Sequence, residues 1–575
     1  MRQVCTARGG ADVRRCRRMG SSSSRWFRSA GVRETAATRV TKLTIKQMIQ
    51  GIGAAGPSQQ EKERLMPDPI LLWNKIALEA NRVSHTNGQG EQTGPTLSAR
   101  ALAIVHLAMY DAFAGITNNP AQLPRYISTP ASPGGGTPEA LSAAVAAAAY
   151  TTLVALFPSQ KPFFDGIFEG EGDPASAAHA FGVAVGQAIL ADRAMDPGAG
   201  GGYKPSLLPG KHRPDPDNAG QGFHAPLFGA ASKGFGITAR HELAPPPFGD
   251  STYLDAVKEV RGKGILPELA GTLPGSLDKR TPDETVIGIY WGYDGASEIG
   301  TPPRLYNQIV RRVAVARNNT PAANARLFAF VNVAMGDAAI LAWDQKYIHN
   351  FWRPVVGVRE HDASFGPAAP EADNDITNDA DPQWLPLGAP NTNRVGSKNF
   401  TPNFPAYPSG HATFGAAAFH ITRLFYGQGG TLDGSGANGL KKDSLFDGLD
   451  FVSDEFNGIS VDIRGTVRPR HRRNFPDGLW QMILENGRSR VLLGVHWVFD
   501  AFLKDTVAAI RKKTGGKYTG GVPLGLLIAE DVFNFGNGKA PKKSTVPPRT
   551  PAAAPAAMQG AETFSSTFRP DTQAR

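Results

Sequence analysis

The chain has 575 residues, of which 41% are hydrophobic, enough to bury one large core or two adjoining ones. Its formal charge is +10, but the first 40 residues carry ten arginines against one aspartate and one glutamate, so the remainder is close to neutral. The arginine-rich stretch lacks the interleaved aromatic side chains on which bases stack, and we therefore do not expect a nucleic-acid partner.

Residues 1–66 form a basic, low-complexity leader rich in arginine, serine and glycine. It contains no apolar h-region of the kind that secretory signals carry. Two interpretations stay open. The leader is an organellar transit-like segment, or translation begins downstream of residue 1, at Met19, Met48 or Met66. The cellular compartment is therefore not predicted.

Both cysteines, Cys5 and Cys16, lie in this leader. The body of the chain therefore has neither a disulfide nor a thiol ligand, which excludes cysteine-ligated zinc and redox dithiols there. The best candidate for a membrane span, residues 327–342, is shorter than about 18 residues and carries Asp337. We expect a soluble protein with no membrane partner.

Apolar periodicity and helix-favouring composition predict helices, whereas strand-like alternation is scarce. The predicted helices are 72–81, 101–113, 140–156, 175–192, 322–351, 412–426, 479–491 and 497–512. The fold class is therefore all-α, with an N-terminal helical half at 67–245 and a C-terminal half at 246–535. Residues 536–575 are rich in proline and alanine and too poor in apolar side chains to pack, so we expect a disordered tail.

The first motif is Lys346-x6-Arg353-Pro354. Trp343, Lys346, Asn350 and Arg353 are spaced by three, four and three residues, so they share one face of the predicted helix. Proline disfavours helix at the residue before it, which predicts that the helix stops where Arg353 is delivered. Taken alone, the two cations are typical of a solvated helix face.

The second motif is Pro408-Ser409-Gly410-His411, which runs from a stiff loop into a predicted helix. Ser409 is a good N-cap, and Gly410 lets the backbone approach an anion at the positive end of the helix dipole. His411 can move protons as a general acid or base. Taken alone, the motif is equally typical of an ordinary capped helix.

The third motif is Ser489-Arg490-x5-His496, and Asp500 follows His496 by four residues. That spacing permits a hydrogen bond between the carboxylate and the imidazole, which would fix the tautomer and leave the other ring nitrogen free to attack phosphorus or bind a metal. Taken alone, His496 is more typical of a satisfied core histidine.

Together the three motifs predict a pocket for a tetrahedral oxyanion such as phosphate or vanadate. Lys346, Arg353 and Arg490 supply three full positive charges, and the start of the second helix offers further hydrogen-bond donors. All three patterns co-occur by chance in about 2 of 100,000 chains of this length. Their co-occurrence argues against the purely structural role that each motif suggests when taken alone.

The three motifs resemble those of the superfamily that joins vanadium-dependent haloperoxidases with acid phosphatases and type-2 phosphatidic acid phosphatases. The resemblance to fungal-type vanadium chloroperoxidases extends over about residues 67–535. It is carried by Leu72-Trp73-Asn74, Asn81-Arg82-Val83-Ser84-His85, Leu97-Ser98-Ala99-Arg100-Ala101, Tyr293-Asp294-Gly295, Gly300-Thr301-Pro302-Pro303-Arg304 and Gly494-Val495-His496-Trp497. It implies a fold of two four-helix bundles, with vanadate bound in the second bundle. It also implies that the protein uses neither haem nor flavin.

The resemblance also implies roles for the motif residues. Vanadate oxygens would be neutralised by Lys346, Arg353 and Arg490, with further hydrogen bonds from Ser409 and Gly410. His496 would bond vanadium and His411 would act as acid or base, while Asp294 would brace Arg490. Hydrogen peroxide and a halide would then give hypohalous acid, with Lys346 polarising the bound peroxide and vanadium acting as a Lewis acid. Small organic acceptors would react with the product.

Trp343 and Phe404 match the apolar pair of the chloroperoxidase halide pocket, whereas bromoperoxidases tend to carry histidine at the position of Phe404. The resemblance therefore favours chloride, with bromide also oxidised. The alternative is that both aromatic side chains belong to the core, as large aromatic residues on helices usually do.

Two other functions stay open on the motifs alone. A soluble phosphomonoesterase would use the same pocket, with His496 as nucleophile and His411 protonating the leaving group. A noncatalytic protein that only binds oxyanions would need the same charges. The oligomeric state and the organic acceptor are not predicted.

Overall fold

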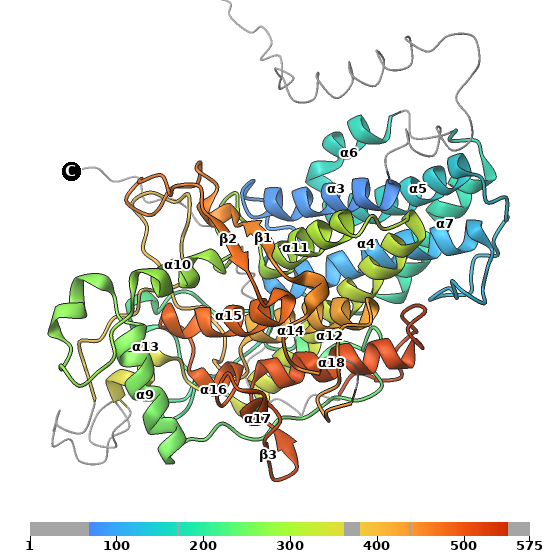
Figure 1. Cartoon of the computed structure of the whole chain (residues 1–575). Coiled ribbons are helices and arrows are strands. Elements are labelled where there is room, and N and C mark those ends of the chain that lie inside the picture. Colours follow the sequence, from blue (N-terminus) through green and yellow to red (C-terminus); the bar gives the residue numbers. More distant parts are fainter. Residues whose placement is uncertain (1–67, 170–172, 361–379, 436–438, 550–575) are drawn as a thin grey trace, which may run out of the picture. The chain divides into compact units, whose positions relative to one another are not determined.

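Helices carry most of the regular structure in the described part of the chain, which comprises residues 68–169, 173–360, 380–435 and 439–549 of a computed structural model (Figure 1). The helices up to residue 245 are α3 (Pro69–Ser84), α4 (Gly94–Thr117), α5 (Pro138–Leu156), α6 (Lys161–Phe168), α7 (Ala177–Asp192) and α8 (Phe228–Ala231). The later helices are α9 (Ser251–Lys263), α10 (Pro282–Tyr290), α11 (Pro302–Ala316), α12 (Pro321–His349), α13 (Pro354–Glu360), α14 (Gly410–Phe425), α15 (Gly478–Leu492), α16 (Val498–Ala501), α17 (Val507–Ile510) and α18 (Gly521–Phe535).

The strands of the described residues form two short antiparallel pairs. β1 (Leu449–Val452) pairs with β2 (Arg472–Phe475), with Leu449 opposite Phe475. β3 (Lys513–Thr514) pairs with β4 (Lys517–Tyr518). The predicted all-α class is therefore confirmed.

Local sequence sets the ends of the longest helix, α12. The Thr320 hydroxyl accepts the backbone N–H of Ala323, and Pro321 occupies the first turn, where a missing N–H costs nothing. Asn350 adopts the left-handed conformation, with φ of 54°, and ends the helix. Between these ends almost every side chain is buried, because α12 is surrounded by other helices.

α12 packs against helices from both the earlier and the later part of the described chain. It lies near the middle of the helices in Figure 1. On one side it packs against α4, which in turn packs against α5 and α7. On another side it packs against α14 and α18, and α14 also contacts α15 and α11. The division of the body at residue 245 stays a prediction.

Three helices, α4, α5 and α12, are long and apolar enough to cross a membrane by length and composition. The most apolar windows of α4 and α12 are each 94% buried inside the protein, so their apolar side chains are already used in the core. The sequence analysis found one short candidate for a membrane span, at 327–342. The structure shows that this segment belongs to the 29-residue helix α12.

Seven of the eight predicted helices correspond to observed ones, and six of these agree within three residues at each end. The seventh, predicted at 101–113, is α4, which begins seven residues earlier. The prediction of one helix at 497–512 is wrong, because Phe502 is extended and Thr506 caps a separate short helix, α17. The helices that the periodicity missed are α6, α8, α9, α10, α11, α13 and α18. In α18 the glycines and Pro523 lower the intrinsic helix propensity.

The prediction of a disordered tail is wrong for residues 536–549. The backbone N–H of Ser544 donates to Phe235 at 2.9 Å, and the carbonyl of Val546 accepts from Gly234 at 3.0 Å. Ala540 and Val546 are buried in the core, so a few apolar contacts and backbone hydrogen bonds hold this segment. Residues 550–575 of the predicted tail and the leader 1–66 lie outside the described residues.

Candidate active site

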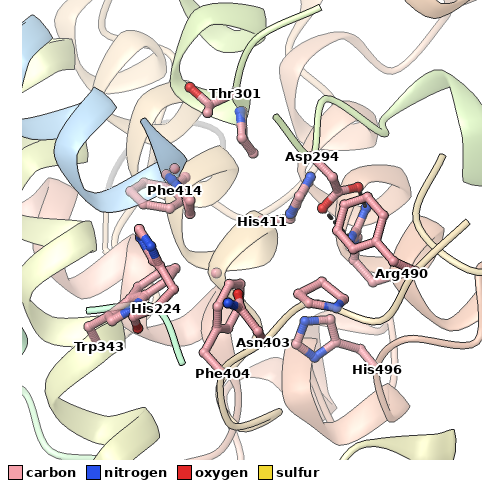
Figure 2. Close-up of a pocket in the computed structure, with 16 residues that line it drawn as sticks. His224, Asp294, Thr301, Trp343, Asn403, Phe404, His411, Phe414, Arg490 and His496 are labelled. Carbon is pink, nitrogen blue, oxygen red and sulfur yellow. Dashed lines mark hydrogen bonds and ion pairs between the residues drawn. The ribbon is translucent and has the colours of Figure 1, made fainter. Parts of the chain in front are cut away.

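A cavity of about 120 Å³ is lined by residues of the second and third sequence motifs (Figure 2). Lys346 and Arg353 of the first motif do not line it, but Arg353 contacts its wall at His496. Its wall includes the side chains of His224, Asp294, Trp343, Phe404, His411, Arg490 and His496. Figure 2 shows a polar side with Asp294, Arg490 and His496, and an aromatic side with Trp343 and His224. The cavity is far smaller than the roughly 300–1,000 Å³ of pockets that take drug-sized ligands, so its size suits small ions.

Arg353 reaches the site from the turn between α12 and α13 and not from a helix face. The prediction that it shares a helical stripe with Lys346 is therefore wrong, because Asn350 already leaves the helix. Its Nε donates to the carbonyl of Phe404 at 2.8 Å, and one terminal nitrogen, Nη1, donates to Nε2 of His496 at 2.9 Å. The other, Nη2, is buried and has no hydrogen-bond partner among the described residues.

Lys346 is fully buried on the last turn of α12. Its ammonium group donates to the carbonyls of Pro405, Ala406 and Pro408 at 2.8, 3.0 and 2.6 Å. Burial, and then the nearby Arg353 charge, lower its pKa well below the ordinary value. Three carbonyl acceptors match the three protons of the ammonium form, so this geometry stabilises the charge that burial disfavours.

Ser409 is the N-cap of α14, as predicted, and its hydroxyl accepts the backbone N–H of Ala412 at 3.4 Å. Its own N–H donates to the carbonyl of Asp500 at 2.8 Å. The donors that remain for an anion are therefore the Ser409 hydroxyl and the backbone N–H of Gly410, the first residue of the helix.

His411 lies in the first turn of α14 and faces the cavity. Its Nε2 is 2.7 Å from the carbonyl oxygen of Gly292, and because a carbonyl only accepts, Nε2 carries the proton. Burial, and then the Arg490 charge, lower the pKa of His411 to about 3. The neutral ring therefore keeps a lone pair on Nδ1, which can accept a proton.

His496 has the orientation that its spacing from Asp500 predicts. Nδ1 and the Asp500 carboxylate are 2.7 Å apart, and burial, followed by the Arg353 charge, lowers the histidine pKa well below its ordinary value. Nδ1 therefore holds the proton, and Nε2 has a lone pair that now accepts from Arg353. Burial raises the pKa of Asp500 to about 7, against the opposing charge of Lys346.

Arg490 and Asp294 form a two-pronged ion pair, with distances of 2.8 and 3.0 Å. The guanidinium is 1% exposed, and its Nε has no hydrogen-bond partner among the described residues. Asp294 follows Tyr293, whose backbone N–H donates to the buried carboxylate of Glu455 at 3.3 Å. Glu455 thus steadies the loop that holds both Asp294 and the carbonyl of Gly292.

The residues of this site fit a tetrahedral oxyanion. Three cations face two nearby carboxylates, which leaves a positive surplus. Two buried guanidinium nitrogens, Nη2 of Arg353 and Nε of Arg490, have no acceptor among the described residues. His496 adds a lone pair for the central atom. The described residues contain no group of three His, Cys, Asp or Glu side chains that could hold a metal cation, so the donor set suits vanadate or phosphate and not a bare cation.

The aromatic side of the cavity is built by Trp343 and Phe404, whose ring centres lie 4.8 Å apart. The Lys346 ammonium is 5.5 Å from the first ring and 5.0 Å from the second, so it is within reach of a cation–π attraction. The structure therefore places both aromatic residues beside the cationic group.

Three contributors to the site are absent from the sequence prediction. Glu455 acts through the backbone of Tyr293, and Gly292 acts through its carbonyl, so neither leaves a pattern of side chains. His224 lines the aromatic side, but it lies in a connection without helical periodicity. Its proximity to Trp343 comes from the fold alone.

Comparison with known proteins matches both halves of the chain. Residues 57–169 match the family model of the vanadium chloroperoxidase N-terminal domain, and residues 326–508 match that of the VCPO second helical-bundle domain. The vanadium chloroperoxidase of Curvularia inaequalis is 35% identical over 615 aligned residues, which cover 88% of this chain and 96% of the relative.

Solved structures show the same fold at lower identity. A bacterial vanadium-dependent iodoperoxidase is 18% identical with a TM-score of 0.54, and the match covers 80% of this chain and 96% of that one. The apo-type bacterial vanadium-dependent chloroperoxidase is 16% identical with a TM-score of 0.52, covering 78% and 96% of the two chains.

Proposed function

This chain belongs to the vanadium chloroperoxidase family, and from that membership we propose that it is a vanadate-dependent haloperoxidase that oxidises halide with hydrogen peroxide to hypohalous acid. Chloride and bromide are the proposed halides. The observation that carries the proposal is a pair of buried guanidinium nitrogens that have no hydrogen-bond partner among the described residues, Nη2 of Arg353 and Nε of Arg490. They lie in one site with the lone pair of His496.

Binding of the oxyanion follows from the charges and donors of the site. Arg353 and Arg490 would neutralise vanadate oxygens, together with Lys346, Ser409 and Gly410. Nε2 of His496 would bond vanadium once Arg353 turns its N–H toward the anion. When bound, vanadate would supply the Lewis-acid chemistry that activates hydrogen peroxide.

His411 is the residue that we propose to move the proton. Its Nε2–H is tied to Gly292, so Nδ1 is the nitrogen that would take a proton from the incoming peroxide and return it to the departing product. Lys346 would polarise the oxygen that the halide attacks, once its ammonium group releases one of the three carbonyls that it now bonds. Asp500 would keep His496 in the required tautomer, and Asp294 would hold Arg490.

The small cavity supports small inorganic substrates, since a volume of about 120 Å³ leaves little room beside the oxyanion. Organic acceptors would then react outside the site with released hypohalous acid. The aromatic pair of Trp343 and Phe404 supports chloride as a substrate, because it matches the apolar pair of the chloroperoxidase halide pocket.

The experiment that tests the proposal is halogenation of monochlorodimedone by the purified apoprotein with hydrogen peroxide and chloride or bromide, before and after orthovanadate is added. Hydrolysis of p-nitrophenyl phosphate without vanadate is measured in parallel. Vanadate-dependent halogenation is the expected result. Phosphate hydrolysis without halogenation at any vanadate concentration would replace the proposal with the phosphomonoesterase, with His496 as nucleophile.

A further inference from the structure

The aromatic side of the cavity contains an imidazole that the halide pair of Trp343 and Phe404 does not predict. The His224 ring centre is 6.0 Å from that of Trp343 and nearly perpendicular to it, at 84°. It is 6.2 Å from the ring of Phe404. Figure 2 shows His224 close to Trp343, across the cavity from Arg490 and His496.

The backbone of His224 is held by the same residues that build the aromatic wall. Its carbonyl accepts the indole N–H of Trp343 at 3.3 Å and the hydroxyl of Tyr347 at 2.7 Å. Its N–H donates to the carbonyl of Asn403, the neighbour of Phe404, at 3.0 Å. These bonds fix the backbone that carries the imidazole relative to both aromatic residues.

The space for the ring depends on the start of α4. A Cβ atom on Gly94 would lie 2.3 Å from Cε1 of His224, and Gly94 has a φ of +76° that other residues rarely adopt. This glycine therefore leaves room for the imidazole. The ring remains partly exposed, whereas Trp343 beside it is 1% exposed.

The two ring nitrogens of His224 differ in their surroundings. Nε2 is 2.9 Å from the hydroxyl of the buried Thr96, which can donate or accept. None of the residues that the structure describes hydrogen-bonds Nδ1. When Thr96 donates to Nε2, the neutral ring carries its proton on Nδ1 and has a free donor.

We propose that His224 is a further specificity-determining residue, which donates a hydrogen bond from Nδ1 to the halide beside Trp343 and Phe404 and favours chloride over larger halides. The inference rests on the proposed haloperoxidase function and extends it. A smaller anion loses more hydration energy on entering an apolar wall. A charge-assisted hydrogen bond offsets that loss most for the smallest ion.

The neutral state of the ring suits this role. Desolvation, and then the His85 charge, lower the pKa of His224 to about 4. The imidazole therefore acts near pH 7 as a dipole with one donor, and it adds no charge that would hold hypohalite or the oxyanion on the aromatic side.

The test compares His224→Phe, which keeps a ring and removes the donor, with His224→Asn, whose amide nitrogen can replace Nδ1. We expect His224→Phe to raise KM for chloride about tenfold, in line with the strength of hydrogen bonds to charged groups. KM for bromide should rise clearly less, and His224→Asn should restore much of the preference. Circular dichroism melts establish that each variant folds.

A matched control is His179→Phe, because His179 packs against Phe168 on the edge of α7 and does not line the cavity. This control should keep the wild-type ratio of kcat/KM for the two halides. A binding readout is the chloride-35 NMR line width of the vanadate-loaded protein without peroxide. His224→Phe should narrow the line relative to wild type, and His179→Phe should not.

The outcomes separate this inference from the function on which it rests. The role of His224 alone is overturned if the wild-type protein halogenates with vanadate while His224→Phe changes neither the ratio of kcat/KM for the two halides nor the chloride line width. A wild-type protein that hydrolyses p-nitrophenyl phosphate and halogenates nothing overturns the haloperoxidase function itself, and the inference with it.

Discussion

The carbonyl oxygen of Asp500 accepts the backbone N–H of Ser409 at 2.8 Å, so the residue whose carboxylate orients His496 also fixes the start of α14. Two motifs that lie far apart in the chain are thereby joined through one residue. The side chain and the main chain of Asp500 can be separated experimentally, because a substitution changes only the first.

Asp500→Asn should weaken vanadate binding to the apoprotein by about 10- to 100-fold, the usual cost of losing a partner that orients a ligand. An amide can donate to Nδ1 of His496 and drive the proton to Nε2, which blocks the lone pair. Isothermal titration calorimetry with orthovanadate measures the affinity. Asp531→Asn is the matched control, because Asp531 pairs with His241 at 2.9 Å and neither residue lines the cavity. An affinity for Asp500→Asn within twofold of wild type would contradict the assigned role.

Anion binding should be coupled to proton uptake at His411. Its pKa is lowered to about 3 by burial and by Arg490, and a bound anion offsets the guanidinium charge, which raises that pKa. By linkage, the affinity for sulfate should rise as the pH falls from about 8 to 5. Sulfate does not titrate in this range. Calorimetry in buffers of different ionisation enthalpy counts the protons, and His411→Ala should reduce the uptake. An uptake equal to that of wild type would exclude His411 as the acceptor.

Glu455 should make stability depend on pH in a direction opposite to that of an ordinary ion-paired carboxylate. Burial raises its pKa to about 6 from 4.5, against the charge of Arg468. Its contribution to the free energy of unfolding is therefore fully present below about pH 4.5 and is lost as the pH rises through about 6. The stability of wild type relative to Glu455→Gln should fall by about 2 kcal/mol between pH 4.5 and 7. Urea unfolding at both pH values measures this, and a constant difference would show that Glu455 does not titrate in the window.

Gly525→Ala should destabilise the protein by about 2 kcal/mol or more, because overpacking at a close helix contact costs of that order. A Cβ at this position of α18 would lie 2.4 Å from the carbonyl oxygen of Thr413 in α14. Gly166→Ala is the control, since Gly166 lies exposed inside α6 with no atom within 4 Å of a Cβ. It should stabilise by about 0.5–1 kcal/mol through helix propensity. Thermal melts compare the two, and equal effects would mean that α14 and α18 can separate freely.

The polar side of the site is the part that the sequence predicts best. The Ser409 cap, the spacing of His496 and Asp500, and the pairing of Asp294 with Arg490 all depend on short patterns or on a family motif, and the structure brings these groups together. Arg353 was harder to place, because one left-handed residue, Asn350, takes it off the helix.

The aromatic side was predicted only in part, because its third ring comes from a distant segment. His224 contacts Trp343 although the two residues are 119 positions apart in the chain, and no periodicity encodes that approach. The order of residues 536–549 has a similar origin, since it rests on backbone bonds to Gly234 and Phe235. Such long-range backbone pairing has no signature in composition.

The continuous course of α12 has a consequence for how the enzyme can work. At 1.5 Å per residue its 29 residues span about 44 Å, and the last turns carry Trp343 and Lys346 while the middle is clamped between α4 and α14. A continuous rod that packs on both α4 and α14 leaves no hinge along it, so within the described chain the backbone that carries Trp343 and Lys346 is in place before any substrate arrives. Loading of the proposed site would then need side-chain movements, such as the turn of Arg353 away from His496, and no bending of α12.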